Sequence, residues 1–321
     1  MRNMGHSMHG RRDLLASVDA AAGMSSGLTV RHSADQSAVR YSTGTEAPKL
    51  RAPVNATDCH FHIYDNRFPP AAGGLPAPEA SPADYRALQA RIGTTRGVVI
   101  QPSLYGVDNR PTLEGMAALG PNFRAVAVVN TSVTDAELRR MHELGVRGIR
   151  FNLAQAGATT LEMLEPLSQR VDALGWHCQI NMPGDEIVAA RDTFLRVRGK
   201  LVFDHLAHCP EPAGVASDTF KLIRRLLDQG NTWVKLSGVY TDTTVGPPSY
   251  SDSSAVARAF AAAAPTRVVW GSDWPHPTEK PDNKPDDALL FDLLESWVPD
   301  EAKRNRVLVD NPAELYGFPK G

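Results

Sequence analysis

Histidine and carboxylate side chains at the ends of two apolar runs give this sequence its clearest chemistry. His60 and His62 are two residues apart in the run 56–63, so both imidazole rings project to the same side of an extended strand. Asp273 directly follows the run 267–271 and is a candidate general base. Two imidazoles on one side of a strand are costly unless they bind something, so the pair predicts a functional site.

Two other apolar runs carry charged or titratable side chains that a protein core rarely tolerates. Asp204 and His205 lie in the run 201–206, and strand alternation predicts that only one of them faces inward. Arg150 lies in the run 148–153, where an unpaired guanidinium is costly. A structural salt bridge is one explanation; we favour a guanidinium that grips a substrate carboxylate.

The remaining composition excludes several other classes of protein. Cys59, Cys178 and Cys209 are too scattered for a disulfide framework or a zinc ribbon. Strand alternation places Cys59 away from His60, which predicts a packed core thiol rather than a nucleophile. From Asn55 onward the sequence has no GxSxG, P-loop or GxGxxG motif. A net charge of −2 gives no reason to expect nucleic acid or an anionic membrane as partner, and no apolar stretch is long enough for a transmembrane helix.

These side chains need a scaffold, and from Asn55 onward short apolar runs alternate with amphipathic stretches. Most runs are continuous, as in strands buried on both faces. The expected strands are 56–63, 97–102, 124–129, 148–153, 176–182, 201–206, 232–237 and 267–271. Eight strand–helix repeats predict a single (β/α)₈ TIM barrel over residues 55–321, with catalytic groups at the C-terminal ends of the strands. A doubly wound open sheet is the alternative.

Capping patterns predict where several of the intervening helices begin and end. Ser81 precedes a proline, as at a helix N-terminus. The segments 134–137 and 159–162 both fit a capping box. Gly145 and Gly175 stand where helices should end.

Residues 1–54 show no clear periodicity and are expected to form a flexible N-terminal extension. Arg11 and Arg12 precede a stretch of small residues, a pattern that resembles a twin-arginine export signal. Asp19 interrupts that stretch, and no clean Ala-x-Ala cleavage site follows. A disordered extension is the alternative, so both a periplasmic and a cytoplasmic location stay open.

The order of these motifs resembles the amidohydrolase superfamily, which pairs His-x-His on the first strand with His on the sixth and Asp on the eighth. Several segments are also similar to the 2-pyrone-4,6-dicarboxylate lactonase group, in collinear order between residues 55 and 318. They are Asp58–His62, Gln101–Ser103, Gly148–Asn152, Gly175–His177, Asp204–His205, Trp270–His276 and Asn311–Pro312. That group includes lactonases for pyrone dicarboxylate and sulfomuconolactone and a galactarolactone isomerase, enzymes of aromatic and sugar-acid catabolism.

The resemblance implies a hydrolase that opens a small anionic lactone. Asp273 would activate water, and His60, His62 and His205 would polarise the lactone carbonyl. Arg150 would hold a carboxylate. The other expected substrate contacts are Gln101, Ser103, Asn152, Asn181, Lys235, Tyr240 and His276.

Two departures from the family pattern bear on the cofactor and the substrate. Metal-using members place a histidine, or a bridging Lys or Glu, near the ends of strands four and five, where this sequence has Asn152 and Asn181. We therefore expect no required cofactor. Dicarboxylate lactonases carry a second arginine after strand seven, whereas the loop 237–249 has none. The pyrone is thus not assured as the substrate.

Other functions stay open at this stage. One is a zinc-dependent hydrolase or decarboxylase that holds a divalent metal on His60, His62 and Asp273. Another is a lactone isomerase, against which the retention of Asp273 as a water-activating base argues. A binding protein without activity is disfavoured because all the strand-end residues are present. A homo-oligomer is compatible with the sequence.

Overall fold

The computed structural model describes residues 38–72, 77–155 and 157–319, and the structural statements below concern these residues. They contain eight parallel strands that pair in sequence order from β1 to β8. The strands are β1 Thr57–Phe61, β2 Arg96–Ile100, β3 Phe123–Ala127, β4 Val146–Asn152, β5 His177–Asn181, β6 Lys200–Phe203, β7 Thr232–Leu236 and β8 Val268–Trp270. All eight expected strands are therefore present.

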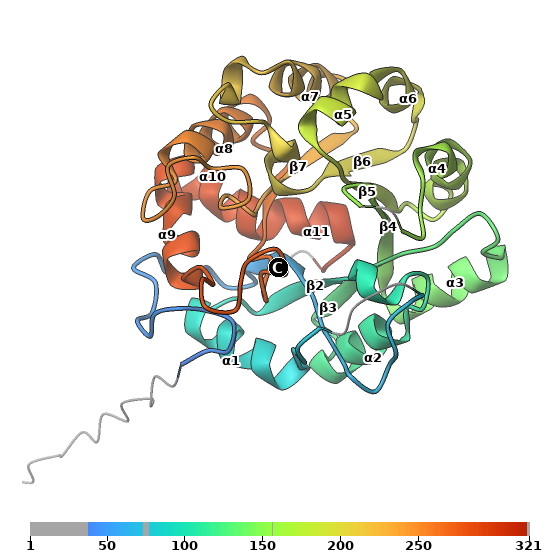
Figure 1. The fold of residues 1–321 in the computed structure, drawn as a ribbon, viewed down its shortest axis with the longest axis horizontal. Helices are drawn as coiled ribbons and strands as arrows, with labels where there is room; N and C mark the ends of the chain where they lie inside the picture. Colours follow the sequence, from blue (N-terminus) through green and yellow to red (C-terminus); the bar gives the residue numbers. More distant parts are fainter. Residues whose placement is uncertain (1–37, 73–76, 156, 320–321) are drawn as a thin grey trace, which may run out of the picture. The chain divides into compact units, whose positions relative to one another are not determined.

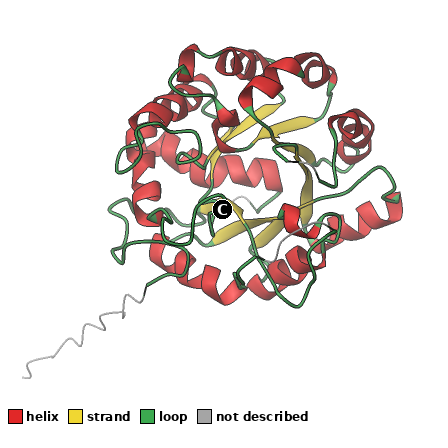
Figure 2. Ribbon diagram, viewed as in Figure 1, coloured by secondary structure: helices red, strands yellow, loops and turns green. Residues whose placement is uncertain are grey.

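Backbone hydrogen bonds between β1 and the chain after β8 bring the two ends of the sheet together. His62 N donates to Trp274 O at 2.8 Å, and Asp273 N donates to His60 O at 2.7 Å. Figures 1 and 2 show the strands enclosed by the helices. The fold is a TIM barrel, as expected, and the open-sheet alternative is wrong.

The helices that surround the strands begin largely where the capping patterns predict. Ser81 caps α1 through a capping box with Asp84, and Thr134 caps α3 by accepting from Glu137 N. The second predicted capping box is wrong, because residues 161–163 form a 3₁₀ turn without a side-chain cap. The helices are α1 Pro82–Ile92, α2 Arg110–Leu119, α3 Asp135–Leu144, α4 Leu164–Asp172, α5 Gly184–Ala189, α6 Arg191–Arg196, α7 Asp218–Asp228, α8 Ser251–Ala263, α9 Asp287–Trp297, α10 Glu301–Asn305 and α11 Asn311–Tyr316.

Helix α11 and the residues after it close the N-terminal end of the barrel. Tyr316 packs edge-on against His177, the first residue of β5, with ring centroids 5.3 Å apart. Phe318 lies against the guanidinium groups of Arg96 and Arg124, which belong to the starts of β2 and β3. Any chemistry inside the barrel must therefore be reached from the opposite, C-terminal end.

The segment 38–54 packs against the barrel, so the predicted boundary at residue 54 was too late. Val39 is buried in the main hydrophobic core. Trp274 Nε1 donates to Arg40 O at 2.8 Å, and Leu50 N donates to Asp292 Oδ1 at 2.8 Å. The twin-arginine pattern lies outside the described residues. Among the described helices, none is both long and apolar enough to cross a membrane.

Candidate active site

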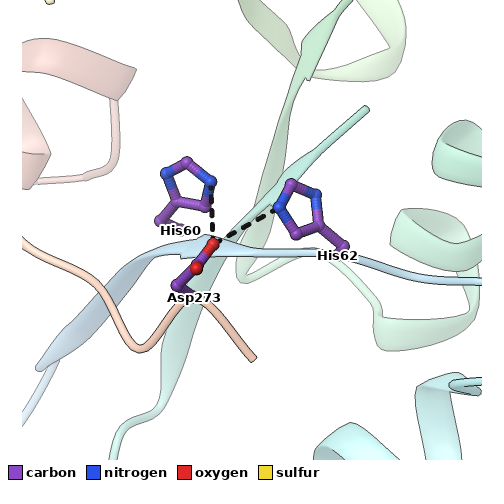
Figure 3. A group of neighbouring side chains, drawn as sticks. All are labelled: His60, His62 and Asp273. Atoms are coloured by element: carbon purple, nitrogen blue, oxygen red, sulfur yellow. Dashed lines mark ion pairs between the residues drawn. The ribbon is translucent and has the colours of Figure 1, made fainter. Parts of the chain in front are cut away.

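Strands β1, β6 and β8 bring the four predicted catalytic side chains to one point. Asp273 Oδ1 lies 3.4 Å from His60 Nε2, 3.4 Å from His62 Nε2 and 3.8 Å from His205 Nε2. Figure 3 shows the Asp273 carboxylate between the His60 and His62 rings. Asp273 Oδ1 and His60 Nε2 are buried and have no hydrogen-bond partner among the described residues. Both atoms are free to bind a reacting group.

Burial and neighbouring side chains set the protonation states at this centre. Burial would raise the pKa of Asp273, but the rings of His205, His62 and His60 outweigh it and hold the pKa well below the usual carboxyl range. Burial lowers the pKa of His205 to about 4. Burial, together with the Lys235 ammonium, lowers the pKa of His60 well below its usual range. At neutral pH a carboxylate base therefore faces two neutral imidazoles, those of His60 and His205.

Hydrogen bonds on the far sides of the rings determine what His60 and His62 present to this centre. His62 Nδ1 lies 2.8 Å from Ile100 O, and a carbonyl can only accept. Neutral His62 therefore carries its proton on Nδ1 and presents an unprotonated Nε2. His60 Nδ1 lies 3.2 Å from Lys235 Nζ, and an ammonium can only donate. Neutral His60 therefore carries its proton on Nε2, which faces Asp273.

Asp273 is held in a conformation that non-glycine residues rarely adopt. Its φ of 63° lies in the left-handed region, which persists only where the surroundings enforce it. The buried carboxylate of Asp58 accepts from Ser272 N at 2.9 Å and from His60 N at 3.1 Å. These bonds join β1 to the chain after β8. The Asp58 carboxylate therefore positions His60 and Asp273 relative to each other.

Asp204 and His205 both turn into the barrel, which corrects the prediction that only one would. Asp204 Oδ2 accepts from Arg150 Nε at 3.1 Å, while His205 faces the Asp273 carboxylate. Strand β6 ends at Phe203, and residues 205–208 all have positive φ. Strand alternation therefore no longer applies at these two positions.

Lys235 lies beneath His60 and is fully buried. Its Nζ donates to Cys59 O at 2.9 Å, to Gln179 Oε1 at 2.8 Å and to His60 Nδ1 at 3.2 Å. Burial lowers the pKa of Lys235 to about 8, although Asp204, 3.6 Å away, opposes this. All three ammonium hydrogens are thus used inside the barrel. The geometry does not support the predicted role of Lys235 as a substrate contact.

Arg150 forms the structural salt bridge that was one of the two explanations for its place in a strand. Its Nε forms a buried salt bridge with Asp204 at 3.1 Å. Its Nη1 and Nη2 atoms have no hydrogen-bond partner within the described part of the chain. Burial raises the pKa of the Tyr64 phenol, and the Arg150 guanidinium opposes this increase. The outer edge of the guanidinium is available to an anion.

Tyr240 and His276, predicted substrate contacts, instead form a hydrogen-bonded chain that ends on Asp273. Tyr240 Oη donates to Asp273 Oδ2 at 2.7 Å and lies 2.8 Å from His276 Nδ1. His276 Nε2 lies 3.1 Å from Oδ2 of Asp287, the first residue of α9. Because Tyr240 occupies Oδ2 of Asp273, Oδ1 is the oxygen left to face the histidines.

A chain of polar side chains runs along one side of the barrel mouth. Asn152 Nδ2 donates to Ser103 Oγ, and Asn181 Nδ2 donates to Asn152 Oδ1 at 2.9 Å. His208 links Asn181 to Asp242 with its two ring nitrogens, at 2.8 and 2.9 Å. Three predicted substrate contacts are thus brought together. His208 and Asp242 extend the chain and were not predicted.

The structure does not support Gln101 as a substrate contact. It is fully buried, and its Nε2 donates to Asp108 O at 2.8 Å. Its Oε1 accepts from Thr112 Oγ1. The side-chain amide shapes the connection between β2 and α2 and has no group left for a substrate.

Cys59 is a buried core thiol, as predicted, but it faces a different way. It packs with Val98 and Trp233 inside the barrel. A register shift in β1 between Asp58 and Phe61 lets adjacent residues Cys59 and His60 both face the interior. Burial raises the pKa of the Cys59 thiol well above its usual range, so the thiolate is disfavoured.

The family model for amidohydrolases matches residues 57–318, the whole of this barrel. The chain belongs to the amidohydrolase family. A 2-pyrone-4,6-dicarboxylate hydrolase from Comamonas testosteroni is 34% identical over 282 residues, with 84% of this chain and 92% of that protein covered. A D-galactarolactone isomerase from Agrobacterium fabrum is 33% identical, with 87% and 96% covered. A crystal structure from Agrobacterium tumefaciens, 31% identical, has a TM-score of 0.81 and covers 88% of this chain and 100% of that one.

Two groups of side chains in this amidohydrolase have the spacing of metal ligands, and both contain His60: His60, His62 and Asp273, and His60, Asp204 and His205. An imidazole ligates a metal through an unprotonated nitrogen. His62 Nε2 meets this requirement, whereas His60 Nε2 carries the proton because its Nδ1 accepts from Lys235. His60 Nδ1, the nitrogen beside Asp204, accepts from the Lys235 ammonium, so with Lys235 charged neither nitrogen of His60 is open to a divalent metal.

Proposed function

We propose that this amidohydrolase opens a small carboxylated lactone by attack of water on the lactone carbonyl. The observation that carries the proposal is the buried Asp273 carboxylate, whose Oδ1 faces three histidines while Oδ2 is held by Tyr240. Two relatives add support, since one is a pyrone dicarboxylate hydrolase and the other a galactarolactone isomerase.

The catalytic groups fit general-base hydrolysis. Asp273 takes a proton from water as the water oxygen bonds to the carbonyl carbon. His60 Nε2–H donates to the carbonyl oxygen, on which negative charge develops. The ring C–O bond then breaks, and the proton on Asp273 passes to the leaving alkoxide, which gives a hydroxy acid. No cofactor is required in this scheme.

Arg150 supplies the contact for the substrate carboxylate. A guanidinium edge matches a carboxylate in geometry and charge. The loop 237–249 contains no second arginine. The amide and hydroxyl groups of Ser103, Asn152 and Asn181 suit hydroxyls on the rest of the molecule. We therefore propose a substrate with one strongly recognised anionic group.

Isomerisation is the second candidate, because the galactarolactone isomerase is nearly as similar as the hydrolase. A hydroxyl of the substrate would then replace water as the nucleophile, with the same base. The product distinguishes the two reactions: hydrolysis releases an acid, whereas isomerisation yields another lactone of equal mass.

A panel of carboxylated γ- and δ-lactones, followed with a pH indicator and by proton NMR, tests the proposal. We expect acid release and an open-chain product for at least one carboxylated lactone. A new lactone without acid release would favour the isomerase. No reaction with any lactone of the panel would contradict the proposed function.

A further inference from the structure

We propose that Lys235 keeps this catalytic centre from binding a divalent metal, because it holds His60 in the tautomer that carries its proton on Nε2. Its consequence for catalysis rests on the proposed function: Asp273 activates water without the help of a metal ion. It also assigns Lys235 a positioning role behind His60 rather than contact with the substrate.

The hydrogen-bond geometry gives each hydrogen of the Lys235 ammonium an acceptor. Its three hydrogens meet three acceptors, Cys59 O, Gln179 Oε1 and His60 Nδ1, at 2.9, 2.8 and 3.2 Å. The side chain is fully buried, so water cannot replace any of the three. Rotation of the ammonium toward Asp204 Oδ1, 3.6 Å away, would take the donor from one of these three acceptors.

The opposite tautomer of His60 would need Asp204 as its acceptor. Asp204 Oδ1 lies 3.3 Å from His60 Nδ1, yet Oδ1 makes no hydrogen bond within the described residues. With a proton on Nδ1, His60 would direct an N–H toward the Lys235 ammonium, which has only donors. The charge of Asp204 is balanced instead by Lys235 and Arg150.

His62 provides the internal comparison. Its Nδ1 donates to the carbonyl of Ile100, the arrangement that is usual for metal-ligating histidines, whose second nitrogen donates to a carboxylate or carbonyl. His60 has an ammonium at the corresponding place. The buried positive charge of Lys235 also opposes a divalent cation on the other side of the ring.

The first test reads the tautomer directly in the wild-type protein. Long-range proton–nitrogen NMR of ¹⁵N-histidine-labelled enzyme at pH 7 distinguishes the two neutral tautomers, and His60→Gln identifies the His60 signals by their loss. We expect His60 with its proton on Nε2. A proton on Nδ1 would overturn the proposal.

The second test measures metal affinity with zinc alone, in competition with a chromogenic chelator at pH 7. We expect Lys235→Met to bind zinc about 10- to 100-fold more tightly than the wild type, because a change of the partner behind a ligating histidine typically alters metal affinity by this factor. Lys200→Met is the matched control, because Lys200 lies at the other end of the barrel and donates to Gly175 O. Its zinc affinity should equal that of the wild type.

Equal zinc affinities for folded Lys235→Met and wild type would overturn the proposal, and circular dichroism reports whether the variant is folded. If it does not fold, the tautomer measurement on the wild type decides alone. Neither experiment uses a lactone. Failure of the lactone panel would therefore refute the proposed function without affecting these results, and the reverse also holds.

Discussion

His60 and His62 are the same residue type on the same strand, yet their partners give them different chemistry. The lysine behind His60 makes its inner nitrogen a donor, and the carbonyl behind His62 makes its inner nitrogen an acceptor. Asp273 faces both, so one position is surrounded by a base, a donor and an acceptor. This division of roles is what a neutral ester needs, because its oxygen must accept a hydrogen bond while water loses a proton.

Asp273→Asn should remove the base while keeping the side-chain shape. We expect kcat to fall by at least about 10²-fold, the low end of general-base contributions. Circular dichroism checks that the fold is retained. Asp228→Asn, at the end of the surface helix α7, serves as a control and should keep wild-type activity. Normal turnover by Asp273→Asn would remove this residue from the mechanism.

Arg150→Met should show whether the guanidinium recognises a substrate anion. Loss of a buried guanidinium–carboxylate pair costs several kcal/mol, so kcat/KM for a carboxylated lactone should fall by about 10²-fold or more. An uncharged lactone of similar shape should lose much less. An equal loss for both substrates would mean that Arg150 acts only through its salt bridge with Asp204.

At the scale of whole elements, hydrophobic patterning predicts the scaffold and fails where the backbone departs from a regular strand. The eight apolar runs correspond to β1–β8, and strand periodicity correctly placed His60 and His62 on one side. Alternation failed at Cys59, where β1 shifts register, and after Phe203, where the chain turns left-handed. Neither the register shift nor the left-handed turn can be predicted from the pattern of apolar residues.

The contacts around Asp273 and His60 were harder to predict than the convergence of His60, His62, His205 and Asp273. Asp287 begins α9, and His208 ends a run of positive-φ residues after β6, so only the folded chain brings them to the site. Lys235 was recognised as a polar residue in a strand, but its depth beneath His60 depends on the stagger of the strands. Gln101 was assigned to the substrate from family resemblance alone, and the loop contacts that it makes are not apparent from sequence.

At the scale of the whole barrel, the N-terminal end is covered by packed side chains, whereas the candidate active site lies at the C-terminal end. Helix α11 covers the N-terminal end, where Tyr316 packs against His177. Both ring nitrogens of His177 are buried without a hydrogen-bond partner among the described residues. Burial is the main reason that the pKa of His177 is lowered from 6.5 to about 3.

His177 should therefore make the protein sensitive to acid. Between the ordinary pKa of 6.5 and the folded-state value of about 3, the unfolded chain binds a proton that the folded barrel excludes. The free energy of unfolding should fall as the pH falls below about 6.5, by up to about 1.4 kcal/mol per pH unit for this group. His177→Met should reduce this slope in urea unfolding measured at pH 5 and pH 7. Identical slopes in both proteins would show that His177 is not a source of the sensitivity.

The incorporation of ¹⁸O from labelled water tests most directly whether this amidohydrolase activates water to open a lactone. After reaction with a carboxylated lactone in H₂¹⁸O, mass spectrometry should find one ¹⁸O atom in the newly formed carboxyl group and none in the released hydroxyl. The label should appear at least about 10²-fold more slowly with Asp273→Asn. A product without ¹⁸O, or label that appears equally fast with Asp273→Asn, would contradict the account.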